Sequence, residues 1–436
     1  MHRLIEQAKT TVDQAELYWK RLQTISVEYE NTRLQQITET DLSSVALRVI
    51  DDGKMGSTFA VSPDHEGLAA QAKAAAAYGD PATFAFAPAA DYPSVDAFSA
   101  ETDALTSEDL VGLCESVKTG ITALRDDLPF FISAETESEE LTIETTEGAE
   151  AHGKANRVFL GFGAPIKGAG MSVFKSASSI SPLIRPDELI AEFAEWYGWT
   201  EKTSTPATGR LPVIFAPGAS FLYLLPLWAG VEGNAIEKKT SPLLDRIGEQ
   251  IFSEQLSVID DPLDPVDPGC RPFDDEGVPC RRRAIVEGGV LKAYLLDLRT
   301  AAALGKTSTG NAVKRALFGG GTETKPNPWP INLAVEPGDV PYRDMIAGLE
   351  EGLLVYYGMG FHSGNYPQGK FAVQAIGYHI KGGKVIGRLD KTMISCDVYE
   401  DFKHVRAVSS ERGRPLSFLG GPAPYVLVDS LQVAGA

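Results

Sequence analysis

The segment from residue 44 to residue 60 is the strongest single constraint on how this chain folds. Two strand-like runs, Ser44–Ile50 and Met55–Ala60, flank the tetrapeptide Asp51-Asp52-Gly53-Lys54. The Asp-Gly pair supplies the positive φ angles that a tight turn between antiparallel strands requires. The segment therefore predicts a β-hairpin, and a β-hairpin implies an antiparallel sheet in this part of the chain.

Strand-like runs outnumber helical ones along the rest of the chain, and hairpin turns join many of them. This pattern predicts an α+β fold with mixed or antiparallel sheets joined by hairpins and flanked by helices. We expect helices at 3–14, 68–78, 107–125 (with Ser107 as N-cap), 188–197, 298–304, 342–350 and 398–406, and strands at 17–33, 130–136, 141–146, 157–163, 170–175, 211–216, 281–286, 290–296, 331–335, 353–357, 371–380 and 424–434.

The chain has 436 residues, which is too long for one ordinary hydrophobic core. Residues 200–209 (TEKTSTPATG) are polar and contain a proline, as is typical of a connection between domains. We therefore expect two domains, an N-terminal α+β domain over 1–205 and a sheet-rich C-terminal domain over 206–436.

The composition narrows the classes of partner. Forty basic against 59 acidic residues give a net charge of −19, which disfavours direct binding to nucleic acid or to an anionic membrane. The chain has no apolar run of membrane-spanning length and no signal-peptide core, and its four cysteines are scattered. We expect a cytoplasmic protein without disulfides, membrane segments or a cofactor.

Residues 211–234 (LPVIFAPGASFLYLLPLWAGVEGN) look like the framework of an active site. A strand-like run is followed by a Pro-Gly turn and by an apolar helix for which Ser220 is the expected N-cap. Backbone amides and the helix dipole converge at such a helix N-terminus. Yet the run Phe221–Val231 contains no His, Cys, Asp, Glu, Lys or Arg. The segment is therefore expected to have the backbone arrangement of an active site, but its helix lacks the side chains that usually catalyse reactions or bind metals.

A glycine-rich loop, residues 358–369 (GMGFHSGNYPQG), is the second candidate region. Glycines around His362, Asn365 and Tyr366, with Gly369 at the end, are typical of a backbone that approaches a ligand closely. A plain surface loop, a catalytic histidine and a loop that contacts a peptide or partner protein all remain open.

Other motifs are incomplete. Gly305-Lys306-Thr307 lacks the upstream glycine of a phosphate-binding loop, and His65-Glu66 lacks the second histidine of a zinc helix. Ser220 lacks the flanking glycines of a nucleophile elbow. Cys270 lies in a loop rich in proline and glycine, with no histidine nearby in the sequence.

Several segments, taken in order, resemble the TldD/PmbA family, once described as modulators of DNA gyrase and now regarded as a metallopeptidase system. The hairpin at 46–60 is similar to the family's N-terminal strand pattern. Residues 272–312, which begin PFDDEGVPCRRR, resemble its central Asp-x-Glu-Gly passage. The segments 363–385, 397–405 and 426–436 are also similar, so the resemblance covers nearly the whole chain.

The resemblance implies which residues to compare with a metal site. The TldD kind of subunit carries His-Glu-x-x-x-His on a helix followed by Gly-Leu-Glu-Gly-Asp, and here Gly230–Asn234 resembles the latter passage. The motif positions are then Leu224, Leu225 and Ala229, and no cysteine follows residue 396 to complete the family's ligand set. The chain therefore resembles the PmbA (TldE) kind, for which we expect no catalytic residue, metal or cofactor of its own.

By this resemblance, we expect a non-catalytic subunit that completes a TldD-type peptidase acting on unfolded peptides or peptide precursors. A TldD-type catalytic chain is the expected partner, with a homodimer in its absence and peptide substrate bound through the complex. Two alternatives stay open: a stand-alone hydrolase that uses Ser220 or Cys270 as nucleophile, and a non-enzymatic adaptor of gyrase or a toxin system.

Overall fold

The computed structural model describes residues 2–61, 67–168, 170–317, 319–361, 364–413, 419 and 421–435. Within them the helices are α1 (His2–Lys9), α2 (Leu68–Ala76), α3 (Ala100–Asp103), α4 (Ser107–Leu124), α5 (Pro186–Gly198), α6 (Phe221–Val231), α7 (Gly233–Glu237), α8 (Leu298–Ala303), α9 (Tyr342–Ala347) and α10 (Val398–Asp401), with 3₁₀ turns η1 (Trp199–Glu201), η2 (Pro217–Ala219), η4 (Tyr366–Gln368) and η5 (Phe402–His404).

The strands form an N-terminal group and a C-terminal group. The first is β1 (Gln14–Glu30), β2 (Arg33–Asp51), β3 (Lys54–Ala60), β4 (Phe131–Thr145), β5 (Glu150–Pro165) and β6 (Ser172–Ser179). The second is β7 (Thr203–Ser204), β8 (Gly209–Phe215), β9 (Val258–Asp260), β10 (Arg283–Glu287), β11 (Val290–Leu291), β12 (Ala312–Val313), β13 (Asn327–Pro328), β14 (Leu333–Val335), β15 (Glu351–Met359), β16 (Lys370–Lys381), β17 (Lys384–Leu389), β18 (Met393–Asp397), β19 (Val405–Gly413) and β20 (Ala423–Ala434).

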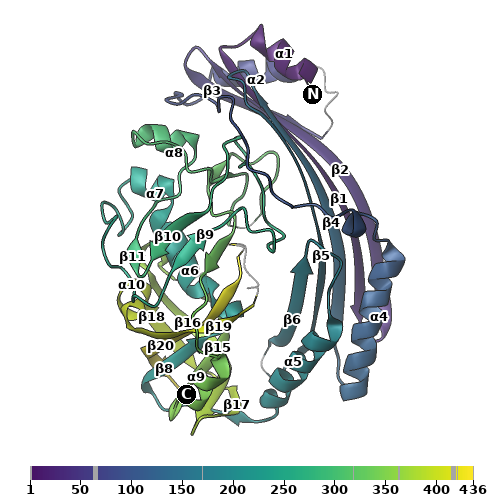
Figure 1. Ribbon diagram of the computed structural model, residues 1–436, viewed down its shortest axis with the longest axis vertical. Helices are drawn as coiled ribbons and strands as arrows, with labels where there is room; N and C mark the ends of the chain where they lie inside the picture. Colours follow the sequence, from purple (N-terminus) through teal and green to yellow (C-terminus); the bar gives the residue numbers. More distant parts are fainter. Residues whose placement is uncertain are drawn as a thin grey trace.

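The N-terminal strands form one antiparallel sheet in the order β3-β2-β1-β4-β5-β6. The predicted hairpin is confirmed: Asp51 pairs with Lys54, and both turn residues, Asp52 and Gly53, have positive φ angles (48° and 68°). In Figure 1 the long strands curve over the C-terminal half, and α4 lies along their outer face. The α+β expectation is therefore confirmed.

Helix α4 covers the outer face of this sheet because its apolar residues recur every three or four positions. Leu110, Cys114, Val117 and Ile121 are buried in a core cluster that also contains Val27 of β1. The expected cap at Ser107 is wrong by one residue, since the Thr106 hydroxyl accepts a hydrogen bond from the Asp109 amide. The carboxylate of Asp109 accepts from the Thr106 amide in return, which completes a capping box.

The C-terminal half is built around a mixed eight-stranded sheet, ordered β15-β8-β20-β18-β16-β17-β7, with β19 paired to β20. Strands β15 and β8 run parallel, whereas most other neighbours are antiparallel. A four-stranded sheet, β11-β10-β9-β14, and the β12–β13 pair complete this half. The division into domains at 205/206 stays a prediction.

Three expectations about these elements are wrong. The strands expected at 130–136 and 141–146 are one continuous strand, β4, because both of its edges are paired, with β1 and with β5. The helix expected at 398–406 ends at Asp401 and gives way to η5 and then to β19, which begins at Val405. The outer half of β2, from residue 33 to residue 44, was not expected to be a strand.

A buried ionic cluster joins the two halves. Arg48 of β2 is 7% exposed and lies opposite Glu16 of β1, to which it donates two hydrogen bonds (2.7 and 2.6 Å). A guanidinium nitrogen of Arg48 also donates to Glu276 in the C-terminal half (3.0 Å). Burial opposes the charge of Arg48, but the two carboxylates outweigh burial and raise its pKa. We name this triad of Glu16, Arg48 and Glu276 the junction cluster.

Residues 274–277 (DDEG) present Glu276 to this cluster through a tight turn. The carboxylate of Asp274 accepts hydrogen bonds from the amides of Glu276, Val278 and Ala312, which fixes the backbone. Gly277 has a positive φ angle of 74°, which suits glycine best. The second carboxylate oxygen of Glu276 accepts from the amide of Leu298 at the start of α8.

Candidate functional site

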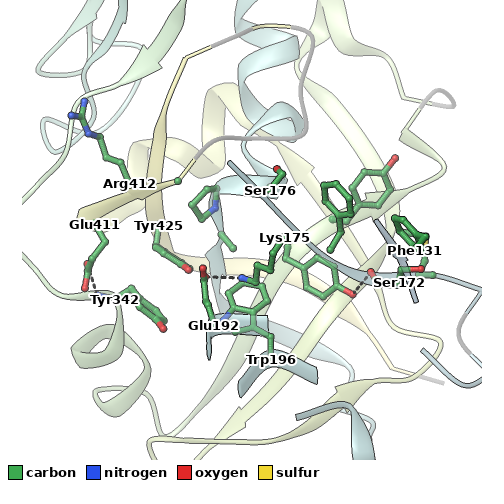
Figure 2. A pocket seen from close by; sticks show the side chains of 18 of the residues that line it. Phe131, Ser172, Lys175, Ser176, Glu192, Trp196, Tyr342, Glu411, Arg412 and Tyr425 are labelled. Atoms are coloured by element: carbon green, nitrogen blue, oxygen red, sulfur yellow. Dashed lines mark hydrogen bonds and ion pairs between the residues drawn. The ribbon is translucent and has the colours of Figure 1, made fainter. Parts of the chain in front are cut away.

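A cleft of about 710 Å³ lies between the end of the N-terminal sheet and the C-terminal sheet. One wall comes from β4, β6 and α5, and the other from η2, β15, β19, β20 and the start of α9. Figure 2 shows the side chains that line it. The lining residues are Phe131, Gly170, Met171, Ser172, Phe174, Lys175, Ser176, Glu192, Trp196, Ala216, Pro217, Gly218, Tyr342, Tyr356, Tyr357, Glu411, Arg412, Gly413 and Tyr425.

The first wall is an aromatic surface at the edge of the sheet. Strand β6 is the last in the sheet order, so one of its edges has no neighbouring strand among the described residues. Phe131 of β4 and Phe174 of β6 stack with ring centroids 6.0 Å apart and an interplanar angle of 17°. Gly163 lies between these residues in the sheet, where a Cβ atom would come within 2.9 Å of the Phe131 ring. Glycine at this position therefore permits the stack.

Lys175 provides a fixed cation in this wall. Its ammonium nitrogen lies 2.6 Å from a carboxylate oxygen of Glu192 and 3.6 Å from the ring centre of Trp196, and both residues belong to α5. Burial lowers the pKa of Lys175, while the charge of Glu192 opposes this shift. The ion pair and the cation–π contact hold the ammonium group in one place.

Tyrosines form most of the opposite wall. The Tyr356 hydroxyl donates to the Ser172 carbonyl across the cleft (3.4 Å), so the two walls touch at one end. Tyr342 and Tyr425 stack with centroids 4.2 Å apart and an interplanar angle of 10°. The Tyr342 amide donates to the carboxylate of Glu411 at 3.0 Å, which fixes the start of α9 against β19.

The residues that line the cleft can bind a ligand, but they are not arranged to cleave a bond. No histidine or cysteine is among its described lining residues. Aromatic rings favour apolar groups, and the ends of Arg412 and Lys175 favour a group of negative charge. The sequence analysis missed this cleft, although a lysine in the inward-facing pattern of strand 170–175 was a signal that could have marked it.

Helix α6 contains the positions that the family resemblance aligns with metal ligands. Leu224 and Leu225 are 0% and 2% exposed, within an apolar cluster that includes Phe215 and Phe402. Ala229 is only partly buried. Hydrocarbon side chains offer no lone pair to a metal ion and cannot transfer a proton. The donor set at these three positions therefore does not fit a metal.

The same helix shows how an apolar segment is held without ionic groups. Pro226 lies within it, and the carbonyl of Pro226 accepts a hydrogen bond from the Tyr399 hydroxyl at 2.9 Å. The Trp228 ring packs against Trp329 with centroids 4.3 Å apart. Packing against these aromatic residues anchors both the middle and the end of the helix.

Neither nucleophile candidate has the surroundings of one. Ser220 is 0% exposed, and its hydroxyl has no hydrogen-bond partner among the described residues. Ser220 occupies the predicted N-cap position of α6, but its φ and ψ angles, −59° and −28°, are helical and its hydroxyl makes no capping hydrogen bond. Cys270 is buried, and burial raises the pKa of its thiol to about 11, which keeps it protonated near neutral pH.

The described residues of the glycine-rich loop, 358–361 and 364–369, lie against α6, and none of them lines the cleft. Phe221 of α6 contacts Phe361 (ring centroids 5.2 Å), and Phe361 in turn contacts Tyr366. Gly369 has a φ angle of 73°, and a Cβ atom there would lie 2.5 Å from the Tyr399 ring. The Asn365 carbonyl accepts from the amide of residue 370.

Of the four residues predicted for this loop, Asn365, Tyr366 and Gly369 therefore come together near α6. His362 lies outside the described residues, as do His65 and Glu66 of the incomplete zinc motif.

Two further searches cover the described part of the chain. Within those ranges, no group of three or more His, Cys, Asp and Glu side chains has an arrangement that could hold a metal ion. None of the helices described there is long and apolar enough to cross a membrane.

The two sheets, the cleft between them and the apolar helix define a class of α+β protein that has been seen before. Residues 208–435 match the family model of the PmbA/TldA metallopeptidase C-terminal domain, and residues 15–78 match domain 1 of the same family. The chain belongs to this family of PmbA/TldD metalloprotease-like proteins.

Individual relatives give the same result. The metalloprotease PmbA homologue of Buchnera aphidicola is 26% identical over 232 residues, which is 52% of this chain and 47% of the relative. A metalloprotease TldD homologue of the same organism is 27% identical over 56% of this chain and 49% of its own. The chain thus matches about half the length of these curated relatives.

Solved structures match over the full length. TldE from Thermococcus kodakarensis has a TM-score of 0.90 with 23% identity, covering 100% of both chains. A Thermotoga maritima protein described as a candidate modulator of a DNA gyrase has a TM-score of 0.85, also with 23% identity, over 99% of each chain. At these identities the likeness establishes the fold.

Proposed function

We propose that this protein is a PmbA/TldE-like subunit, without catalytic activity of its own, that completes a TldD-type metallopeptidase acting on unfolded peptides or peptide precursors. One observation carries the proposal. At the positions aligned with metal ligands and a general base, Leu224 and Leu225 are buried in an apolar core, and the third position is Ala229.

The aromatic cleft supports a role in holding peptide. A 710 Å³ cleft with stacked rings and a fixed ammonium group suits side chains of an unfolded peptide better than it suits a chemical step. In this proposal the partner supplies the metal and the hydrolysis, and the present chain supplies binding surface and shape. A homodimer in the absence of the partner belongs to the same proposal.

Co-expression with a TldD-type chain that carries His-Glu-x-x-x-His is the direct test. We expect the two chains to co-elute on size exclusion and a casein-derived peptide mixture to be cleaved only when both are present. As a matched control, the glutamate of the partner's His-Glu-x-x-x-His motif is replaced by glutamine. This change should abolish cleavage and leave assembly of the two chains intact. Failure to form a complex, or no gain of peptidase activity on mixing, would contradict the proposal.

A second experiment addresses the isolated chain. The triple variant Leu224→His, Leu225→Glu, Ala229→His restores the three residue types, yet the family's later cysteine is also missing. We expect no peptidase activity with added Zn²⁺ and a lower melting temperature, because a carboxylate enters an apolar core. Robust activity would show that this helix needs only its ligands to become a metal centre.

The stand-alone hydrolase is the weaker alternative. The buried hydroxyl of Ser220 has no general base beside it among the described residues, and the Cys270 thiol is buried and protonated. Peptidase activity of the purified chain that survives a chelator but is lost in Ser220→Ala or Cys270→Ala would favour that alternative.

A further inference from the structure

A second, smaller pocket lies where the N-terminal sheet meets the C-terminal half, and it brings two arginines together. Its volume is about 250 Å³, and its lining includes Arg157 of β5, Arg315 just after β12, and Trp329. It is separate from the aromatic cleft, since the two share no lining residue.

Arg157 has unused hydrogen-bonding capacity. One terminal nitrogen donates to the carboxylate of Glu137 at 3.0 Å. The Nε atom is buried and has no partner among the described residues. A guanidinium group offers five donors in a planar fork, so a single bond to Glu137 leaves most of that fork unused.

Arg315 has even fewer partners. Over the described ranges, no carboxylate forms an ion pair or hydrogen bond with its guanidinium group, which instead lies 5.9 Å from the ring centre of Trp329. Burial, and then the charge of Arg157, lower the pKa of Arg315. The two cations are therefore close enough to repel each other, and an anion between them would relieve that repulsion.

The backbone around Arg315 is fixed, so the side chain is presented from a defined position. Its amide donates to the Val313 carbonyl (2.8 Å), and its carbonyl accepts from the Asn327 side chain (3.4 Å). Residue 315 also forms an isolated bridge with Gly320. These contacts fix the backbone at residue 315, while the side chain itself is exposed and available to a ligand.

The carboxylates that line the pocket already have cationic partners. Glu137 binds Arg157, and Glu139 forms an ion pair with Lys20 of β1. Arg271, which also lines the pocket, is paired with the buried Asp275 at 2.6 Å. Arg315 is thus the cation in this pocket whose charge is left for a ligand.

We propose that Arg315 and Arg157 form a carboxylate-binding site, and that its ligand is a carboxylate of a peptide, either the C-terminal group or an acidic side chain. The planar forks of two arginines match the two oxygens of a carboxylate, and Trp329, which is 3% exposed, lines the pocket beside them. The peptide class rests on the proposed function, but the binding event does not require a catalytic partner.

Calorimetry on the isolated full-length chain tests this site without any peptidase assay. The probes are tetraalanine with a free C-terminus, its C-terminal amide, and an acetylated, amidated tetrapeptide with one internal glutamate. We expect the free acid or the glutamate peptide to bind, and the plain amide to bind at least tenfold more weakly. The probe that binds identifies which carboxylate the site takes.

Variants assign the binding to the pocket. Arg315→Gln should weaken binding of the carboxylate probe at least tenfold, while Arg185→Gln, an exposed arginine that lines neither pocket, should leave it unchanged. Circular dichroism checks that both variants fold, and raising NaCl from 0.05 to 0.5 M should weaken binding by the wild type more than by Arg315→Gln.

Three results would overturn the proposal: neither carboxylate probe binding more tightly than the plain amide, no effect of Arg315→Gln, or inorganic phosphate that competes as tightly as the peptide. None of them bears on whether the chain assembles with a TldD-type partner, so the two proposals fail separately.

Discussion

Helix α6 and the junction cluster are both deeply buried, but they are stabilised in opposite ways. The helix contains no acidic or basic side chain from Phe221 to Val231 and is held mainly by apolar packing. The junction cluster buries two carboxylates around Arg48 and depends on each charge having its partner. The comparison shows that the charged interior of this protein lies where the two halves meet, and not on the helix that resembles a catalytic one.

Loss of Arg48 should give the largest change. Arg48→Met leaves Glu16 and Glu276 buried without their cation, which costs about 3–5 kcal/mol of the free energy of unfolding. Urea denaturation followed by circular dichroism measures it. The additional removal of Glu16 in Glu16→Met, Arg48→Met should recover part of the loss, because fewer unpaired charges remain. A stability equal to that of the wild type would contradict the role of the cluster.

A cavity beside α6 should cause the second largest loss of stability. Leu224→Ala removes a fully buried side chain from a packed core and should cost about 2–5 kcal/mol. The same measurement on Leu42→Ala is the control, because Leu42 is 64% exposed and its truncation should change little. Similar losses in the two variants would mean that the apolar cluster is not tightly packed around α6.

The two regions should also differ in their response to pH. Burial, opposed by Arg48, raises the pKa of Glu276 to about 8 from an ordinary value near 4.5. The folded state therefore holds a proton that the unfolded state releases, so the stability from this group is complete below about pH 4.5 and is lost as pH rises toward 8.

Glu276→Gln cannot titrate, so its free energy of unfolding should fall less steeply over that range. A series of urea titrations from pH 4.5 to 8.5 on both proteins provides the comparison. Leu224→Ala should keep the wild-type slope, since burial raises the pKa of Tyr223, the titratable residue of α6, well above this pH range. Parallel slopes for the wild type and Glu276→Gln would place the pH dependence elsewhere.

Loss of a surface ion pair should give the smallest change in the free energy of unfolding. Arg21 and Asp41 form two hydrogen bonds across β1 and β2, with side chains that are 39% and 49% exposed. Water and salt screen such a pair. Arg21→Met should leave the urea midpoint unchanged within error, and a clear shift would show that burial is not what distinguishes Arg48.

Local sequence chemistry predicted the elements that depend on neighbouring residues. Asp52-Gly53 specified the first hairpin, and the apolar spacing in residues 107–125 specified α4. The first half of β2 was missed because residues 33–44 are largely exposed on both faces and lack an alternating pattern. The break expected within β4 reflected the acidic residues at 135–140, whereas pairing on both edges keeps that strand continuous.

The candidate sites also differ in how far the sequence predicts them. The absence of metal-binding side chains on α6 could be predicted from the sequence, because it depends only on the identity of Leu224, Leu225 and Ala229. The aromatic cleft and the pocket of Arg157 and Arg315 were not visible, since each combines residues from both halves of the chain. Only the fold brings such residues together, and the lysine in residues 170–175 was a weak local signal for the cleft alone.

The length of the first strands has a mechanical consequence. Strand β1 has 17 residues, and at about 3.3 Å per residue it is roughly 55 Å long. Glu16 lies near its beginning, in the junction cluster, and its last residue, Glu30, pairs with Phe131 of the aromatic cleft. The Tyr356 hydroxyl donates to the Ser172 carbonyl at that cleft, so the two halves touch there as well. The sheet is therefore held against the C-terminal half at both ends of its long strands, and this double attachment fixes its orientation.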